Sequence, residues 1–541
     1  MSLAIKVFRT ILVSGVALLA VACAPLAERT VTTESGGLSF FHLNDTYRID
    51  AVEDGAKGGF GRVTTLLREA RADGREPRVL HAGDFLYPSL ESQLWDGLQM
   101  IDAMNFMHDL APMLVVIGNH ETDSRNPQHL IDAVRASKFD WLGDNYRFST
   151  GAADVDDALH SRYMLDYAGK KIGVLSLTMH PDDGGNDRDY LSVDGDYKRV
   201  AERVIGELEQ KGADLIIGLT HLHLWEDKEI AALKAQHPTF RLIVGGHEHE
   251  PEFIAETANS AAIAKGASNA RTIWRIDIDV DEQGELQLSQ LRPLALDESV
   301  ASDADYDLLA GKWRSRMLEK FPFITARVGE AALPMDAREV SIRERESSWG
   351  NFIVDQMRRA FGEPAADLAF LNSGTLRLDD YVVGDVRFED IGRTFGFSSY
   401  LRHLQISGAE FRELLEAGYR GFAPSQGYFP QVSGFRVCVD RSRPEFERIV
   451  SLQVPAAEGW QEIDPDRDYS LVVSDFVYGG GDGYVFPEHI VASRPASELK
   501  YLVLDAIMAA QSRGEKVGVA VDPANPRIVI LGSPDGICWP D

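Results

Sequence analysis

Short apolar runs alternate with helix-like stretches along the first part of the chain. The apolar runs cover residues 38–41, 78–81, 113–117, 172–177, 215–218 and 242–244. Between the first two runs, Val63, Leu67 and Ala70 recur at the spacing of one face of a helix. Strands that alternate with helices build a largely parallel core sheet covered by helices, so this pattern predicts an α/β fold.

The length of the chain indicates more than one domain. Its 541 residues exceed what a single hydrophobic core normally organises, so we expect two domains. Residues 303–321 are charged and suit a helix, and we interpret them as the connection between a first domain at 38–302 and a second at 322–541. The second domain also has an α/β pattern and contains a glycine-rich loop at 479–483.

The N-terminus is typical of a secretory signal. Lys6 and Arg9 precede the apolar run 10–22, which ends in small residues before Cys23 and is short for a membrane-spanning helix. Residues 19–23 also resemble a bacterial lipoprotein cleavage site, although Ala20 stands where leucine is usual. We expect a signal segment at 1–23, a linker at 24–37, and export to the periplasm or cell envelope of a bacterium. Lipidation of Cys23 and ordinary signal cleavage nearby are both compatible with this sequence.

Cys438 and Cys538 are the cysteines that follow Cys23. In an exported chain they could form a disulfide, and two buried thiols are the alternative. Neither cysteine has the spacing of a metal site.

The net charge of the chain limits which kinds of partner it can bind. The formal charge of -29 argues against a general nucleic-acid or anionic-membrane binder, which would need a basic face. A small phosphate-bearing substrate stays compatible with this charge, because bound divalent metals can reverse the field locally. Contact with a membrane is expected only through a lipid at Cys23, and the sequence does not indicate the oligomeric state.

Side chains that can ligate metals follow five of the strand-like runs. They are Asp45, Asp84, Asn119 with His120, His221, and His247 with His249. The carboxyl ends of parallel strands meet at one edge of a sheet, where ligands of open α/β folds bind. Carboxylate, amide and imidazole groups suit divalent ions such as manganese, iron or zinc. Four other histidines are interpreted as structural hydrogen-bonding residues: His81, His129, His180 and His223.

The set predicts a site for two metal ions. Two ions about 3.5–4 Å apart could clamp a phosphate and supply hydroxide near neutral pH. Asp84 suits the bridging position, because each of its carboxylate oxygens can ligate one ion.

These residues stand in motifs that resemble those of the calcineurin-like metallophosphoesterases. The motifs are Asp45, Gly83-Asp84, Gly118-Asn119-His120-Glu121, Thr220-His221 and Gly246-His247-Glu248-His249. The resemblance implies a sandwich of β-sheets flanked by helices. It also implies that one ion binds Asp45, Asp84 and His249. The ligands that it implies for the other ion are Asp84, Asn119, His221 and His247.

The same resemblance gives His120 and Asp123 a part in catalysis. His120 would stabilise the transition state or protonate the departing ribose oxygen, and Asp123 would orient and charge it. A structural role for His120 beside Asn119 is the alternative.

The first motif departs from the family. Nucleotidase-type members usually have Asp-x-His there, whereas this chain has Asp45-Thr46-Tyr47. In addition, the segment from Asp84 to Tyr87 is similar to the motif whose tyrosine binds ferric iron in purple acid phosphatases. We hypothesise that Tyr47 or Tyr87 is a phenolate ligand of an iron-containing site. Simple packing of both tyrosines is the alternative.

The second half resembles the 5'-nucleotidase domain of periplasmic UDP-sugar hydrolases and ecto-5'-nucleotidases. The matching segments are 343–346 with 350–351, 372–377, 394–397 and 476–482. The resemblance implies that Phe397 and Phe476 sandwich the base and that Asp482 holds the ribose hydroxyls. The residues that it implies for phosphate or ribose oxygens are Arg343, Asn372 and Arg377. Ser373 and Gly396 stand where the family has glycine and proline, which leaves the base preference open.

Together the two halves imply an exported enzyme of the 5'-nucleotidase type, with two divalent metal ions (manganese, zinc or iron) and a small nucleotide as substrate. Within enzymes, the alternatives are a 2',3'-cyclic-nucleotide phosphodiesterase and a hydrolase of nucleotide-sugar pyrophosphates. A non-catalytic nucleotide-binding lipoprotein, with its first metal site lost at Tyr47, is the alternative from a different class.

Overall fold

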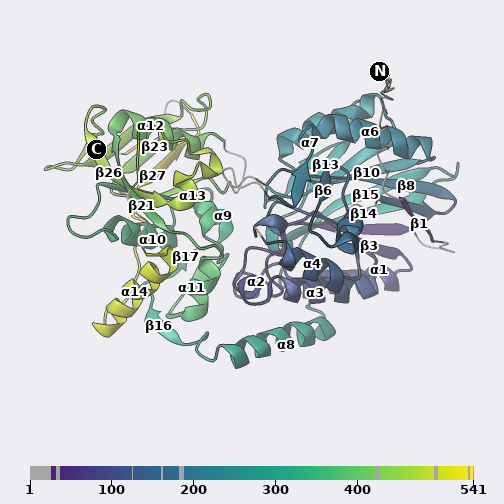
Figure 1. The fold of residues 1–541 in the computed structure, drawn as a ribbon, viewed down its shortest axis with the longest axis horizontal. Helices are drawn as coiled ribbons and strands as arrows, with labels where there is room; N and C mark the ends of the chain where they lie inside the picture. Colours follow the sequence, from purple (N-terminus) through teal and green to yellow (C-terminus); the bar gives the residue numbers. More distant parts are fainter. Residues whose placement is uncertain are drawn as a thin grey trace, which may run out of the picture.

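The computed structural model describes residues 26–31, 37–124, 126–159, 162–181, 188–421, 426–492, 497–533 and 536–539. The expected signal segment, with Cys23, lies outside these ranges. Figure 1 shows two lobes joined by helix α8 (Ala304–Lys320), which lies below the first lobe in this view and leads to the second. Among the described residues, no helix is both long and apolar enough to cross a bilayer.

The first lobe contains a six-stranded and a seven-stranded sheet. The six-stranded sheet has the order β15-β14-β2-β3-β4-β5, and the bounds are β2 (Leu38–Leu43), β3 (Glu76–His81), β4 (Met113–Val116), β5 (Asp140–Leu142), β14 (Thr272–Val280) and β15 (Leu286–Ala295). The seven-stranded sheet has the order β1-β7-β8-β10-β11-β13-β12, and the bounds are β1 (Leu26–Val31), β7 (Arg162–Tyr167), β8 (Lys170–Thr178), β10 (Leu215–His221), β11 (Phe240–Gly245), β12 (Glu252–Ile254) and β13 (Ala262–Lys265). Strands β2 to β5 run parallel to one another, as do β8, β10, β11 and β13.

Each strand that the apolar runs predict is present, and these strands lie in two sheets, as the family resemblance implied. The strands that precede the candidate ligands are divided between the sheets, with β2, β3 and β4 in one and β10 and β11 in the other. One continuous apolar core includes Val79 and Val115 from the first sheet and Ile217 and Val244 from the second. Apolar periodicity identifies a strand but not its partner, so the pattern could not separate one sheet from two.

Helices cover both sides of this pair of sheets. Helices α1 (Phe60–Ala72), α3 (Leu98–Leu110) and α4 (Gln128–Ala136) lie on one side, and α6 (Tyr197–Gln210) and α7 (Leu224–Ala231) lie on the other (Figure 1). In α1, Phe60, Val63, Leu67 and Ala70 form the buried face that the helical spacing predicts. The fold of this lobe is therefore the expected sandwich of sheets between helices.

Part of the expected linker is a strand. Residues Leu26–Val31, inside the 24–37 segment, form β1 and pair in parallel with β7 at the edge of the seven-stranded sheet. An open sheet edge presents unpaired backbone N–H and C=O groups, so an extended segment can pair there without a strong side-chain pattern.

Helix α8 packs on the first lobe. Tyr306 and Trp313 are buried in the first-lobe core, and the Trp313 indole donates a hydrogen bond of 2.9 Å to Asp102. Met317, near the end of the helix, packs with Ile324 and Leu90 where the second lobe begins. The connection is therefore a helix anchored at both ends.

The second lobe is also α/β. Its four-stranded sheets have the orders β21-β26-β18-β22 and β25-β24-β23-β27, with bounds β18 (Leu368–Asn372), β21 (Leu401–Ser407), β22 (Pro430–Ser433), β23 (Arg436–Asp440), β24 (Ile449–Pro455), β25 (Trp460–Glu462), β26 (Asp468–Ser474) and β27 (Ile528–Leu531). The helices include α9 (Glu339–Ile342), α10 (Ser348–Arg359), α11 (Phe388–Thr394), α12 (Gly408–Glu416), α13 (Asp475–Tyr478) and α14 (Leu499–Ser512). Cys438 in β23 and Cys538 form a disulfide, which resolves the alternative left open by the sequence.

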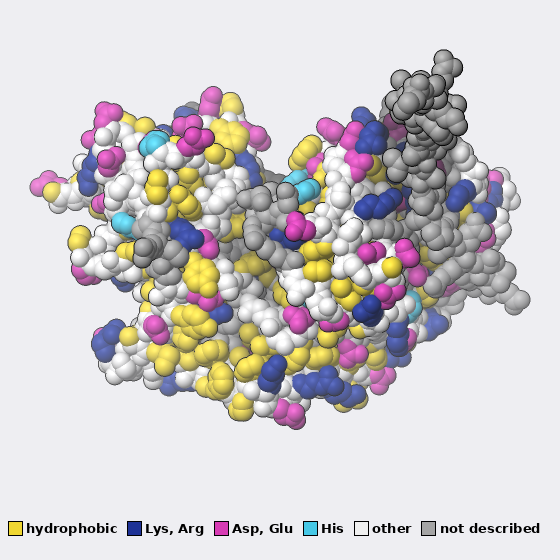
Figure 2. All heavy atoms as spheres, viewed as in Figure 1, with side chains coloured by type: hydrophobic (Ala, Val, Ile, Leu, Met, Phe, Trp, Pro, Cys, Tyr) yellow, Lys and Arg dark blue, Asp and Glu magenta, His cyan; other side chains and the backbone are white. Residues whose placement is uncertain are grey.

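Figure 2 shows the same view in space-filling form, with a notch between the lobes. Acidic side chains are scattered over both lobes on this face, with basic side chains among them, and form no single patch.

Candidate active site

The loops after the ligand-bearing strands have unusual backbone geometry. Asp45, Asp84, His247 and His249 have φ angles of 51°, 59°, 84° and 64°, in the left-handed region that side chains other than glycine rarely adopt. Such conformations persist where the surrounding structure enforces them, and they cluster at functional sites. The loops therefore hold these four side chains in place at a cost in local strain.

Asp45, Asp84 and His249 form the tightest group. One potential ligand atom from each lies within 4.8 Å of the others, and all three residues are buried. The His249 Nε2 atom is 3.2 Å from Asp45 Oδ1. Burial alone would raise the pKa of Asp45, but the neighbouring His249 imidazole holds that pKa well below its usual value. A charged carboxylate is the form that binds a cation.

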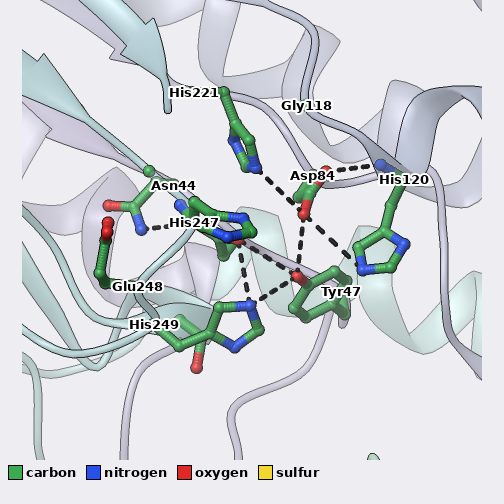
Figure 3. Close-up of polar contacts among 12 residues, drawn as sticks. Asn44, Tyr47, Asp84, Gly118, His120, His221, His247, Glu248 and His249 are labelled. Atoms are coloured by element: carbon green, nitrogen blue, oxygen red, sulfur yellow. Dashed lines mark hydrogen bonds and ion pairs between the residues drawn. The ribbon is translucent and has the colours of Figure 1, made fainter. Parts of the chain in front are cut away.

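Tyr47 reaches into the same group. Its hydroxyl lies 3.2 Å from Asp45 Oδ1, 3.3 Å from Asp84 Oδ2 and 3.0 Å from His249 Nε2, as Figure 3 shows. Burial and the carboxylates of Asp84 and Asp45 raise the pKa of Tyr47 well above 10, so the hydroxyl is a hydrogen-bond donor here. Tyr87 lies elsewhere: its hydroxyl donates to Asp96 Oδ1 at 3.0 Å. Of the two tyrosines, only Tyr47 is within reach of the candidate ligands.

His221 and Asn119 stand on the other side of Asp84. The His221 Nε2 atom lies 3.3 Å from Asp84 Oδ2 and 3.1 Å from Asn119 Oδ1, while Nδ1 faces the Ala82 carbonyl at 2.6 Å. Burial would lower the pKa of His221, but the Asp84 carboxylate outweighs it and raises that pKa to about 10.

His247, which is also predicted as a ligand of the second ion, lies beside His221 and Asp45. Its backbone N–H donates to Asp45 Oδ2 at 2.8 Å, and its ring centroid lies 5.5 Å from that of His221. Burial and the nearby His223 and His221 rings hold the pKa of His247 well below 6.5, so the imidazole is neutral and keeps a lone pair for a ligand. His223, interpreted from the sequence as structural, lies 4.4 Å from His247 between ring centroids.

The donor chemistry of these residues fits divalent cations. The carboxylates of Asp45 and Asp84, the amide oxygen of Asn119 and the imidazoles of His221 and His249 lie close together. Such oxygen and imidazole donors are the ligands that these ions prefer. Among the described residues, Asp45, Asp84 and His249 make the single group of three acidic or imidazole side chains close enough to share one ion.

Glu121 holds the Asp84 loop, a role the sequence analysis missed. Its fully buried carboxylate accepts hydrogen bonds from four backbone N–H groups, those of Asp84, Phe85, Leu86 and Gly118, at 2.6–3.0 Å. Gly118 has to be glycine, because an added Cβ would lie 2.1 Å from Asp84 Oδ1. The Gly-Asn-His-Glu motif contained this signal, since it places Glu121 two residues after the candidate ligand Asn119.

A second buried anchor holds the loop of His247 and His249. The ammonium group of Lys265 lies 2.8 Å from Asp227 Oδ2 and 2.5 Å from Glu248 Oε2, and it donates to the Gly246 carbonyl at 3.1 Å. Lysine is almost never fully buried unless it is paired. A lysine at the end of the apolar run 262–264 was the sequence signal for it.

His120 faces Asp84 and is oriented by Asp123. Its backbone N–H donates to Asp84 Oδ1 at 2.9 Å, its Nδ1 lies 2.9 Å from Asp123 Oδ2, and its Nε2 lies 3.9 Å from Asp84 Oδ2. Burial lowers the pKa of His120, but Asp123 and Asp84 together raise it above the ordinary value. The upward shift of this pKa favours the protonated form of His120 beside the candidate metal site.

A cavity of about 480 Å³ lies between the lobes and joins the two predicted sets of residues. From the first lobe it is lined by Asp84, Asn119, His120, Asp123, His247 and His249. From the second lobe it is lined by Arg343, Asn372, Arg377, Phe397, Phe476 and Asp482. Asp45 and His221 are fully buried behind this wall. The volume is in the usual range for a small-molecule site.

Within the second lobe, the pocket side chains are fixed by one another. The Asn372 amide donates to Asp482 Oδ2 at 2.7 Å, and Asp482 has a φ of 54°. The Arg377 guanidinium lies 5.2 Å from the Phe397 ring centroid. The Phe476 ring packs over Gly481, where an added Cβ would lie 2.5 Å from the ring, and the side chain remains 37% exposed. Phe476 is thus free to stack on a ligand.

Arg420 and Tyr428 are pocket residues that the sequence analysis missed. The Arg420 guanidinium lies 3.7 Å from the Tyr428 ring centroid and donates to the Asp482 carbonyl at 2.6 Å. Both residues line the cavity. They stand outside the motif segments, so only the fold brings them to the site.

Comparisons with known proteins agree with this architecture. The model of the calcineurin-like phosphoesterase family matches residues 38–251, and that of the 5'-nucleotidase C-terminal domain matches residues 327–488. The chain is 23% identical to the 5'-nucleotidase of Bos taurus over 496 residues, which is 83% of this chain and 84% of that protein. It is 25% identical to the trifunctional nucleotide phosphoesterase YfkN of Bacillus subtilis over 83% of this chain, but it spans only 32% of that protein.

Among solved structures, the 5'-nucleotidase precursor of Thermus thermophilus shares the fold, with a TM-score of 0.76 and 23% identity over 92% of this chain and 100% of that one. The chain belongs to the calcineurin-like metallophosphoesterases that carry a 5'-nucleotidase C-terminal domain. It is accordingly a metal-dependent phosphoric ester hydrolase.

Proposed function

We propose that the chain is a 5'-nucleotidase-type enzyme that removes phosphate from nucleotides at the cavity between its lobes. One observation carries this proposal: a single cavity is lined both by the metal-type side chains of the first lobe and by the aromatic, amide and arginine side chains of the second. A substrate that spans the cavity would present its phosphate to the first set and its base to the second.

Two divalent ions are proposed as cofactors. Asp45, Asp84 and His249 would hold one, and the ligands proposed for the other are Asp84, Asn119, His221 and His247. When bound, such ions polarise phosphoryl oxygens and lower the pKa of water. Manganese, zinc and iron all suit this donor set, and Tyr47 is the tyrosine placed to ligate iron.

The chain's own residues supply the proton and the positioning. His120 would donate a proton to the departing ribose oxygen, and Asp123 would keep its imidazole oriented and charged. Arg377 lies 3.4 Å from His120 Nε2, so one side chain of the second lobe is placed to hold the phosphate beside the proton donor.

The base and ribose are proposed to bind the second lobe. Phe397 and Phe476 would stack on the base, since every base has a π-face. Asp482, braced by Asn372, would accept hydrogen bonds from the ribose hydroxyls. Arg343 would add a further charged contact to phosphate or ribose oxygens.

We assign residues 38–302 to the metal-binding domain, 303–321 to the connecting helix and 322–541 to the substrate-binding domain. We also propose that the enzyme acts outside the cytoplasm. The signal-like sequence before Cys23 and the disulfide support this location, since disulfides persist in oxidising compartments.

The test is a substrate panel on one preparation, with and without metal. We expect release of inorganic phosphate from AMP that stops when EDTA removes the ions and returns when manganese is added. Cleavage of 2',3'-cyclic AMP or UDP-glucose in preference to AMP would replace the assignment with one of the two alternative hydrolases. No turnover of any of these substrates by the metal-replete enzyme would overturn it.

A further inference from the structure

A carboxylate of the second lobe contacts a candidate metal ligand of the first. Glu339, the first residue of α9, places Oε1 2.6 Å from Nδ1 of His249, and both side chains are buried. We propose that Glu339 is a positioning residue, which completes the first metal site from the other domain by fixing the imidazole of His249.

Glu339 is itself held rigidly. Its second carboxylate oxygen accepts a hydrogen bond from Ser268 Oγ at 2.5 Å, and its backbone N–H donates to Asp379 Oδ1 at 2.9 Å. The Arg271 guanidinium lies 3.5 Å from Oε2 of Glu339, the oxygen that accepts from Ser268, and adds positive charge beside it. Ser268 and Arg271 belong to the first lobe, so the carboxylate is clamped between the domains.

The contact decides which nitrogen of His249 faces the site. With Nδ1–H donated to the Glu339 carboxylate, the Nε2 lone pair points toward Asp45, whose Oδ1 is 3.2 Å away. A carboxylate partner on the remote ring nitrogen fixes the tautomer and makes the imidazole a stronger ligand. Loss of such a partner typically weakens metal affinity about 10- to 100-fold.

The same carboxylate also touches the proposed substrate pocket. Arg343, which lines the cavity, lies 2.7 Å from Oε1 of Glu339, the oxygen that contacts His249. Cation binding in the first lobe is thus linked through one oxygen to a side chain that faces the substrate. This inference rests on the proposed metal-dependent function.

The test measures Mn²⁺ affinity of the full mature chain by equilibrium dialysis, in the absence of any nucleotide. We expect Glu339→Ala to weaken binding of the first ion about 10- to 100-fold and Glu339→Gln to weaken it less, because the amide oxygen still accepts the hydrogen bond. Glu91→Gln is the matched control. Glu91 forms an interdomain ion pair of 3.1 Å with Arg393 but contacts no candidate metal ligand, so its Mn²⁺ affinity should match that of the wild type.

A double-mutant cycle separates positioning from general damage. If Glu339 acts through His249, then Glu339→Ala in a His249→Ala background should cause no further loss of Mn²⁺ affinity. Melting temperatures of all variants identify any that fail to fold. If Glu339→Ala does not fold, the Mn²⁺ affinity of Glu339→Gln decides the test. The inference is overturned if Glu339→Gln and Glu339→Ala both leave the Mn²⁺ affinity unchanged. It is also overturned if Glu91→Gln loses as much Mn²⁺ affinity as the Glu339 variants, or if the losses in the cycle are additive. Wild-type protein that binds no Mn²⁺ would instead refute the proposed metal-dependent function, whereas wild-type binding without AMP hydrolysis would leave the inference standing.

Discussion

Arg377 of the second domain places its Nη2 atom 3.4 Å from Nε2 of His120 on the first. The same guanidinium lies 5.5 Å from the Tyr47 ring and 5.2 Å from the Phe397 ring. Arg377 therefore lies between the candidate proton donor His120, Tyr47 of the candidate metal site and Phe397 of the base pocket.

The protonation of His120 gives a prediction about the pH dependence of activity. Burial and Arg377 lower the pKa of His120, whereas Asp123 and Asp84 raise it, with a net shift upward. Asp123→Asn should therefore lower this pKa. If His120 donates a proton, activity is lost as the pH rises through its pKa, so the alkaline limb of the kcat/KM profile should move to lower pH.

The matching control for this pH shift is Asp96→Asn, because Asp96 pairs with Tyr87 rather than with His120. In addition, His120→Ala should reduce kcat by roughly 10²–10⁴-fold, the usual size of a general-acid effect. An alkaline limb that stays in place in folded Asp123→Asn enzyme would contradict the role of His120.

Tyr47 and Tyr87 make a matched pair for the iron hypothesis. Tyr47 lies among three candidate ligand atoms, whereas Tyr87 is bonded to Asp96. Iron-loaded wild-type protein should show a visible phenolate-to-iron absorption band that Tyr47→Phe abolishes and Tyr87→Phe retains. Iron-loaded protein without the band would show that both tyrosines simply pack.

Base stacking predicts a selective effect on KM. Stacking on an aromatic side chain contributes about 1–3 kcal/mol per base, so Phe476→Ala should raise KM for AMP roughly 5- to 150-fold with a smaller effect on kcat. Phe361→Ala is the control, since Phe361 is 38% exposed, close to the 37% of Phe476, but packs on His403. Equal KM values for Phe476→Ala and wild type would show that Phe476 does not stack on the base.

The disulfide gives a prediction about stability. Cys438 and Cys538 are 100 residues apart, and a loop of that length corresponds to about 4.7 kcal/mol in the chain-entropy model. Reducing agent should lower the melting temperature of the wild type but not that of a Cys438→Ala, Cys538→Ala double variant. Alkylation of both thiols in non-reduced, denatured protein, detected by mass spectrometry, would show that the bond is absent.

Local patterns predicted much of this molecule. The strands before Asp45, Asp84 and His221 were visible because apolar runs report burial directly, and the candidate ligands were visible because they follow those runs. The gathering of Asp45 and Asp84 could be expected, since they follow neighbouring parallel strands, whereas His221 follows a strand of the other sheet.

Contacts between distant segments could not be predicted from the sequence. Lys265 binds the loop of Glu248, Arg420 braces Asp482, and Glu339 contacts His249 across the domains. None of these pairs has a periodicity or a motif spacing, because the partners are far apart along the chain and meet only in the folded protein. The division of the ligand-bearing strands between two sheets was implied by the family resemblance and not by the apolar pattern.

We propose that Asp84 joins two cations that the enzyme needs to cleave nucleotides. The most direct measurement determines bound metal per chain by elemental analysis, together with phosphate release from AMP, for wild type and Asp84→Asn. We predict two ions per wild-type chain, and loss of metal and of activity together in the folded variant. Wild-type protein with fewer than two ions at full activity, or Asp84→Asn protein that hydrolyses AMP normally, would contradict the account.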